Sequence, residues 1–100
     1  MVCLITFTAK NEQEAFEISK KLLEEKLIAC SNFFPVNSLY WWDNKIEAAK
    51  EFFVVMKAEK SNFKKIVSRI RQLHSYKLPA IEKINVKTYP EAGKWIRSIK

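Results

Sequence analysis

The sequence predicts an α+β domain in which two β-α-β units follow one another and a short helix closes the chain. Three observations support this fold class. Apolar residues recur at every second position in some stretches and at helical spacing in others. The two kinds of stretch alternate along the chain, and a turn signal at 43–44 joins two long extended segments. Two β-α-β units with a hairpin between them form the ferredoxin-like plan β-α-β-β-α-β, whose helices cover one face of an antiparallel sheet.

The composition is typical of one globular domain. The chain has 100 residues, of which 48% are hydrophobic and 29% are charged. This length is enough for one core and too short for two, so we expect a single domain over residues 1–100. Gly93 is the only glycine, which excludes a glycine-rich phosphate-binding loop.

The first ten residues, "MVCLITFTAK", predict a strand and not a secretory signal. They have no basic n-region and only a short apolar run. No stretch of the chain approaches the roughly 18 apolar residues of a membrane span. Cys3 and Cys30 are too few for a disulfide framework. We therefore expect a cytoplasmic protein without a membrane partner.

The first β-α segment is a strand over 2–8 followed by an amphipathic helix. The strand is apolar on both alternating faces, which is typical of a central strand. Asn11 is the expected N-cap, with Glu14 as its capping-box partner, and the helix is expected to end near Lys26. The side of the helix expected to face the core carries Ala15, Ile18, Ser19, Leu22 and Leu23.

A long hairpin is expected from about Ile28 to Lys57. Asp43 and Asn44 fit a two-residue turn, because Asn tolerates the left-handed conformation that such a turn needs. Apolar side chains occupy both faces of the hairpin, so a lone copy would expose an edge and an apolar patch. The expected register pairs Trp41 with Ile46, Trp42 with Lys45, Tyr40 with Glu47 and Leu39 with Ala48.

The second half predicts a helix, a strand and a closing helix. Ser61 is the expected cap of the second helix, the strand "LPAIEKINVK" begins with Pro79, and Pro90 or Glu91 opens the last helix. The apolar stripe of the second helix comprises Phe63, Ile66, Val67, Ile70 and Leu73. The last helix places Ala92, Trp95, Ile96 and Ile99 at helical spacing.

The net charge of +7 is unevenly distributed along the chain. The segment from Lys57 to Lys77 contains seven basic residues and one acidic residue, Glu59. A basic patch of this kind attracts nucleic acid or other anions, whereas a solvated helix face is the simpler interpretation. We take the simpler interpretation and do not expect nucleic acid as a partner. Nucleic-acid binding through the second helix stays open as a third hypothesis of function.

Three stretches resemble corresponding blocks of the CutA family of divalent-ion tolerance proteins. They are "KLLEEKLIACSN", "SLYWWDNKIEAAKE" and "LHSYKLPAI", and "YPEAGKWI" resembles the closing helix of the family. The resemblance covers nearly the whole chain. It implies a homotrimer whose hairpins pair across subunits, and a role in tolerance of divalent metal ions, copper above all. The expected trimer interface comprises Tyr40, Trp41, Trp42, Ile46, Phe52 and Phe53.

The chain departs from the family pattern at positions that bear on metal binding. Some members carry a Cys where this chain has Phe7, a second His where it has Leu73, and an acid where it has Ala80. These departures remove most of the metal ligands that the resemblance implies. Ser75, in place of a common Pro, and Asn44, in place of a common Gly, are milder changes.

His74 and Cys30 are the candidate metal ligands. Imidazole and thiolate together suit copper or another divalent cation, but a tetrahedral site needs four ligands. The alternatives are a histidine packed at a helix end with hydrogen bonds to the backbone, and a buried structural cysteine. Trp41 and its aromatic neighbours could stack bases, but packing is the preferred interpretation.

No catalytic constellation of Ser, Cys, His and Asp stands out, so we do not expect an enzyme. The alternative function is a small-molecule sensor, because trimers of ferredoxin-like subunits resemble the PII signalling proteins in architecture. Its ligand would lie in clefts between subunits, with Tyr76 and Pro79 as candidate cleft residues.

Overall fold

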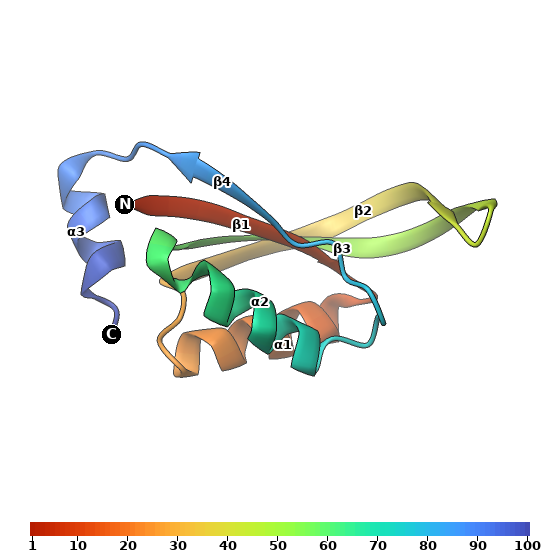
Figure 1. Ribbon diagram of the computed structural model, residues 1–100, viewed down its shortest axis with the longest axis horizontal. Coiled ribbons are helices and arrows are strands. Elements are labelled where there is room, and N and C mark those ends of the chain that lie inside the picture. The colour runs from red at the N-terminus through yellow and green to blue at the C-terminus, as the bar shows by residue number, and fades with distance from the viewer.

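One antiparallel sheet of four strands organises the computed structural model, which describes residues 1–100 (Figure 1). The strands lie in the order β2-β3-β1-β4, and every neighbouring pair is antiparallel. The α+β class and the predicted β-α-β-β-α-β order with a closing helix are confirmed. The elements are β1 (Val2–Ala9), α1 (Glu12–Glu24), β2 (Cys30–Trp42), β3 (Lys45–Glu59), α2 (Phe63–Leu73), β4 (Glu82–Val86) and α3 (Pro90–Ser98).

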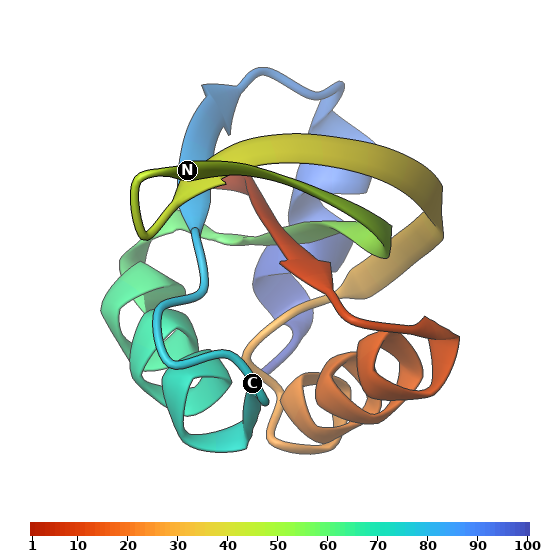
Figure 2. The ribbon, with the colours of Figure 1, turned by 90° about the vertical axis from the view of Figure 1, so that its right-hand side faces the viewer.

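β1 is a central strand because both of its faces are apolar. One face points toward α1 and α2, which lie side by side beneath the sheet (Figure 2), and it contributes Ile5 and Phe7 to the core. Val2 and Thr6, on the opposite face, are also buried. The strand pairs with β3 along its whole length and with β4 from Val2 to Thr6.

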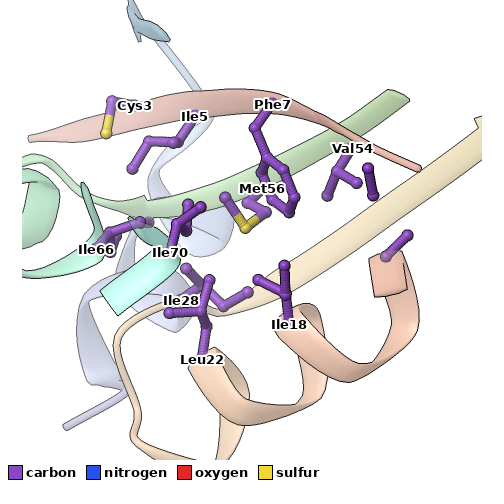
Figure 3. Packing of buried hydrophobic residues seen from close by; sticks show 13 residues of the cluster. Cys3, Ile5, Phe7, Ile18, Leu22, Ile28, Val54, Met56, Ile66 and Ile70 are labelled. Carbon is purple, nitrogen blue, oxygen red and sulfur yellow. The ribbon is translucent and has the colours of Figure 1, made fainter. Parts of the chain in front are cut away.

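The hydrophobic core fills the space between the sheet and the two long helices (Figure 3). Alternate residues of β1 and β3 meet the apolar stripes of α1 and α2, as helical and strand periodicity require. A burial of this kind is the main favourable contribution to folding. The cluster comprises Cys3, Ile5, Phe7, Ala9, Ala15, Ile18, Leu22, Ile28, Val54, Met56, Ala58, Ile66 and Ile70.

α1 begins after its predicted N-cap and ends two residues early. The predicted capping box does not form, because the Glu14 side chain accepts from the N–H of Lys10 and not from that of Asn11. The side chain of Asn11 accepts a hydrogen bond from the N–H of Glu14 at 2.9 Å. The helix stops at Glu24 because Lys26 adopts a left-handed conformation with φ 59°. The N–H groups of Lys26 and Leu27 then bond to carbonyls of the last turn, at Leu23 and Leu22, which is a Schellman motif.

The hairpin turn at Asp43 and Asn44 is confirmed. Both residues have positive φ, at 52° and 61°, which is the requirement of a type I′ turn. The four predicted pairs between β2 and β3 are all present in the register. The hairpin extends well past α1 and α2 (Figure 1), and the longest dimension of the molecule is 45 Å.

Two predicted boundaries in the second half are wrong. Ser61 does not cap α2: a 3-10 turn over Lys60–Asn62 precedes the helix, and no side chain caps its first turn. The Asn62 amide instead donates to the Leu27 carbonyl at 3.2 Å, which ties the start of α2 to the α1–β2 connection. β4 begins at Glu82 and not at Pro79, because Ile81 packs against the core cluster instead of pairing with β1.

The sheet face opposite α1 and α2, here called the open face, is only partly covered. α3 packs at one end of it, where Val2, Ala29 and Ile96 form a second small cluster. Beyond that end, Phe34 and Ile84 are about half exposed. None of the helices has both the length and the hydropathy that a membrane crossing requires.

Candidate functional site

His74 lies directly after α2 and is held by backbone groups on both sides of its ring. Its Nε2 lies 2.7 Å from the carbonyl oxygen of Thr8 at the end of β1, and its Nδ1 accepts a hydrogen bond from the N–H of Tyr76 at 2.9 Å. Because Nδ1 accepts, Nε2 is the ring nitrogen that donates to the Thr8 carbonyl. Its side chain is fully buried, and the ring of Phe7 meets it edge-on at 5.7 Å between centroids.

Glu14 joins the N-terminus of α1 to the loop that follows His74. One carboxylate oxygen accepts from the N–H of Lys10 at 3.0 Å and the other from the N–H of Ser75 at 2.9 Å. Burial acts to raise the pKa of this carboxyl, but the hydrogen bonds from Lys10 and Ser75, with a smaller contribution from His74, outweigh it and lower the pKa. The side chain therefore stays ionised while it is nine-tenths buried.

Tyr76 connects the same loop to β3. Its hydroxyl donates to a carboxylate oxygen of Glu51 at 2.6 Å, and burial together with this carboxylate raises the pKa of the phenol far above its ordinary value. Glu51 lies just beyond the last pair between β3 and β1, and only 5% of it is exposed. His74, Tyr76 and Glu51 thus form one hydrogen-bonded group, and Glu14 lies beside it, 3.9 Å from Nδ1 of His74.

The two candidate metal ligands lie apart within one chain. Cys30 pairs with Lys57 on β3, whereas His74 contacts Thr8, which pairs with Phe53. Lys57 and Phe53 are four residues apart along β3, which corresponds to about 13 Å at the rise per residue of a strand. Cys30 lies 3.8 Å from the ammonium of Lys57. No group of three or more His, Cys, Asp or Glu side chains is gathered as a metal-ligand set.

Residues 3–98 match the model of the family described as CutA1 divalent ion tolerance protein. The chain belongs to the CutA1 family. The divalent-cation tolerance protein CutA of Archaeoglobus fulgidus is 44% identical over 77 residues, which are 77% of this chain and 76% of that protein. The protein of the same name from Thermotoga maritima is 39% identical over 95 residues, or 94% of each.

Solved CutA structures have the same fold along the whole chain. The Archaeoglobus fulgidus structure superimposes with a TM-score of 0.97 at 39% identity and covers 99% of this chain and 98% of its own. The Thermus thermophilus structure has a TM-score of 0.94 at 30% identity, with the same coverage of both chains. The family and these relatives are named for tolerance of divalent cations and not for a reaction.

The predicted cytoplasmic location is contradicted by one of these relatives. The Archaeoglobus fulgidus structure is described as a periplasmic divalent cation tolerance protein. A low number of cysteines is compatible with more than one compartment, so the inference from Cys3 and Cys30 to the cytoplasm is wrong for a CutA1 chain.

Two of the three residues that stand in place of metal ligands implied by the resemblance lie beside His74. Phe7 contacts its ring, and Leu73 precedes it and packs against the core cluster. Both side chains are apolar and offer no electron pair to a cation. Ala80, the third such position, is exposed. The donors within this chain therefore fit a complete metal site poorly, and a metal role for His74 and Cys30 stays a prediction.

The expected interface residues fall into two groups. Tyr40, Trp41, Trp42 and Ile46 are exposed near the hairpin end. Phe53 lies on the open face, where it contacts Phe34 at 5.7 Å between ring centroids. Phe52, by contrast, packs against the chain's own core cluster.

The expected cleft residues differ in exposure, and two residues near them, Glu14 and Glu51, were not predicted as site residues. Pro79 is buried and Tyr76 is half-buried. Glu14 could have been recognised, because it shares helical spacing with the buried Ile18 and Leu22. Glu51 carries no such signal, since its partner Tyr76 is 25 residues away along the chain.

Proposed function

We propose that this chain acts in divalent-cation tolerance as a homotrimer and that copper is the cation it binds. One observation carries the assembly: the hairpin of a single copy presents large apolar side chains to solvent. Trp41 is 72% exposed, Leu39 77% and Ile46 64%. Aromatic side chains of this size typically anchor protein interfaces.

The geometry of the hairpin favours a closed ring. β2 is an edge strand of 13 residues whose outer side has no partner in the sheet, and such an edge pairs readily with another chain. The projecting hairpin and the open face are different surfaces of the same copy. A contact between the hairpin of one copy and the open face of the next is heterologous. Heterologous contacts either close into a ring or grow into filaments. Closure with three copies is what the resemblance to CutA trimers implies.

The metal part of the proposal follows from the family and from the chemistry of His74 and Cys30. Copper(II) favours imidazole and binds more tightly than its first-row neighbours at most sites. Cys30 and His74 of one copy lie too far apart to share an ion, so any shared ion takes its donors from two copies. An ion at His74 must displace either the Thr8 carbonyl or the Tyr76 N–H from the ring. We therefore expect a modest affinity.

Calorimetric titration with copper(II) at neutral pH tests this assignment. We expect wild type to bind, and His74→Ala to bind at least tenfold more weakly, because the chain has no second imidazole. His74→Gln, which retains a hydrogen-bonding side chain, controls for loss of structure, and Cys30→Ala measures the thiol separately. Equal binding by wild type and both His74 variants would remove this residue from the site. If wild type binds no copper, the tolerance role has no direct metal mechanism.

A small-molecule sensor is the second candidate function, and the Glu51–Tyr76 pair favours it. The pair joins a nearly buried carboxylate to a phenol at the margin of the open face, where a neighbouring copy would enclose it. We expect members of a library of nucleotides, amino acids and organic acids to raise the melting temperature of wild type more than that of Tyr76→Phe. A library without effect on wild type would argue against the sensor.

A further inference from the structure

The charged residues that α2 carries on its outer side are all basic. No acidic residue occurs from position 60 to position 81. Three neighbouring hollows on this side all share Lys64. The basic surface, as defined here, comprises Lys60, Lys64, Lys65, Arg71, Lys77 and Lys83, all of which are exposed.

The acidic side chains that border this surface are engaged elsewhere. Glu25 forms an ion pair with Arg69 at 2.9 Å, and Glu59 pairs with the N-terminal ammonium of Met1 at 3.1 Å. Apart from a 3.9 Å contact between the Glu14 carboxylate and the His74 ring, the chain has no other pairing of this kind. None of the six basic residues of the surface therefore has an ion-pair partner.

α1 shows what an ordinary solvated helix face looks like in the same chain. It places Glu17 four residues before Lys21, and Lys20 four residues before Glu24, the spacing at which opposite charges support a helix. α2 has no acid with which to form such pairs. Its repelling cations lower the stability of the helix slightly, and an external polyanion would relieve that repulsion.

We infer that the basic surface docks the phosphate backbone of double-stranded nucleic acid. Its cations extend along all of α2 and into the flanking 3-10 turn, loop and β4, which suits an extended polyanion better than a single small anion. Three apolar residues that line the hollows, Leu27, Phe63 and Val67, are partly buried. Phe63 is the only aromatic residue among them, and the ammonium of Lys83 lies over its ring at 5.1 Å, so no free aromatic face is presented for base stacking. Contacts to phosphates alone carry no sequence preference.

A membrane is a poorer partner for the same surface. An interfacial helix inserts its apolar face among lipids, but Ile66 and Ile70 of α2 are fully buried in the protein core. α2, which carries most of the basic surface, also lies on the helix side of the sheet, away from the open face (Figure 2). It therefore stays free when the open face is covered, and the inference does not depend on the proposed metal function.

Fluorescence anisotropy with a labelled 20-base-pair DNA duplex tests the inference. We expect binding in low salt whose association constant falls as salt rises, with a log–log slope of roughly −3 to −5, the value for four or so phosphate contacts. The double variant Lys64→Glu/Arg71→Glu should weaken binding at least tenfold. It should also make the log–log slope less negative by about two. Scrambling the duplex sequence should change nothing.

The matched control is Lys20→Glu/Lys21→Glu, which makes the same change in net charge on α1. It should weaken duplex binding less than threefold. An equal loss in both variants would overturn the inference, because net charge and not the basic surface would then govern binding. The inference also fails if wild type does not bind in low salt, if polyglutamate competes as well as unlabelled duplex, or if anionic lipid vesicles do so.

Discussion

Trp41→Ala is expected to break up the assembly. Wild type should scatter light at micromolar concentration as a particle of three times the chain mass of 11.8 kDa. Trp41 is 72% exposed in a single copy, so the monomer gains little from it, whereas a buried aromatic anchor typically costs at least ~2 kcal/mol when truncated. Three equivalent contacts are lost together in a ring, and the population should shift to monomers.

Phe16→Ala is the matched control for this experiment. Phe16 is also an exposed aromatic residue, at 53%, but it lies on α1 and away from the hairpin. The Phe16→Ala substitution should leave the particle mass measured by light scattering unchanged. The melting temperature of wild type should also rise with protein concentration, as mass action requires of an assembled protein. A clean monomer for wild type would contradict the proposed trimer, and an unchanged mass for Trp41→Ala would exclude this residue as an anchor.

Phe7→Ala is expected to cause the largest loss of stability of any single substitution considered. Phe7 is 1% exposed, lies in the main core cluster and contacts the ring of His74. Truncating a buried Phe to Ala removes its transfer free energy and leaves a cavity, at a cost of about 3–5 kcal/mol. Chemical denaturation at fixed protein concentration measures this loss as a shift of the midpoint without a change in slope.

The same Phe16→Ala variant separates burial from residue type. An exposed Phe should change the free energy of unfolding by no more than about 0.5 kcal/mol. A loss below about 1 kcal/mol for Phe7→Ala would show that the core closes around the gap, and would contradict the close packing beneath β1.

Local chemistry explains why so much of the fold was predictable. The turn at Asp43 and Asn44 depends on two residues that tolerate positive φ, and the register from Trp41 to Ile46 then follows from the turn alone. Asn11 caps α1 through a bond to a residue only three positions away. Signals of this kind are complete within a short window of sequence.

The candidate site was harder to predict because its contacts are long-range. His74 bonds to Thr8, 66 residues away, and Ser75 bonds to Glu14, 61 residues away. The Ser61 prediction failed for a similar reason, since the Asn62 amide is used for a bond to Leu27. Which polar groups meet across the core depends on how the elements pack, and no local pattern specifies it.

The uninterrupted pairing of β2 and β3 restricts how this hairpin can change in length during evolution. Each residue from Cys30 to Trp42 has one partner, and the turn contains two residues. Inserting one residue into one strand forces a bulge, and inserting one into each strand turns every side chain beyond the insertion to the other side. Two residues per strand are the smallest addition that keeps Trp41 and Trp42 on their present sides. Viable hairpins should therefore lengthen or shorten by four residues at a time, two in each strand.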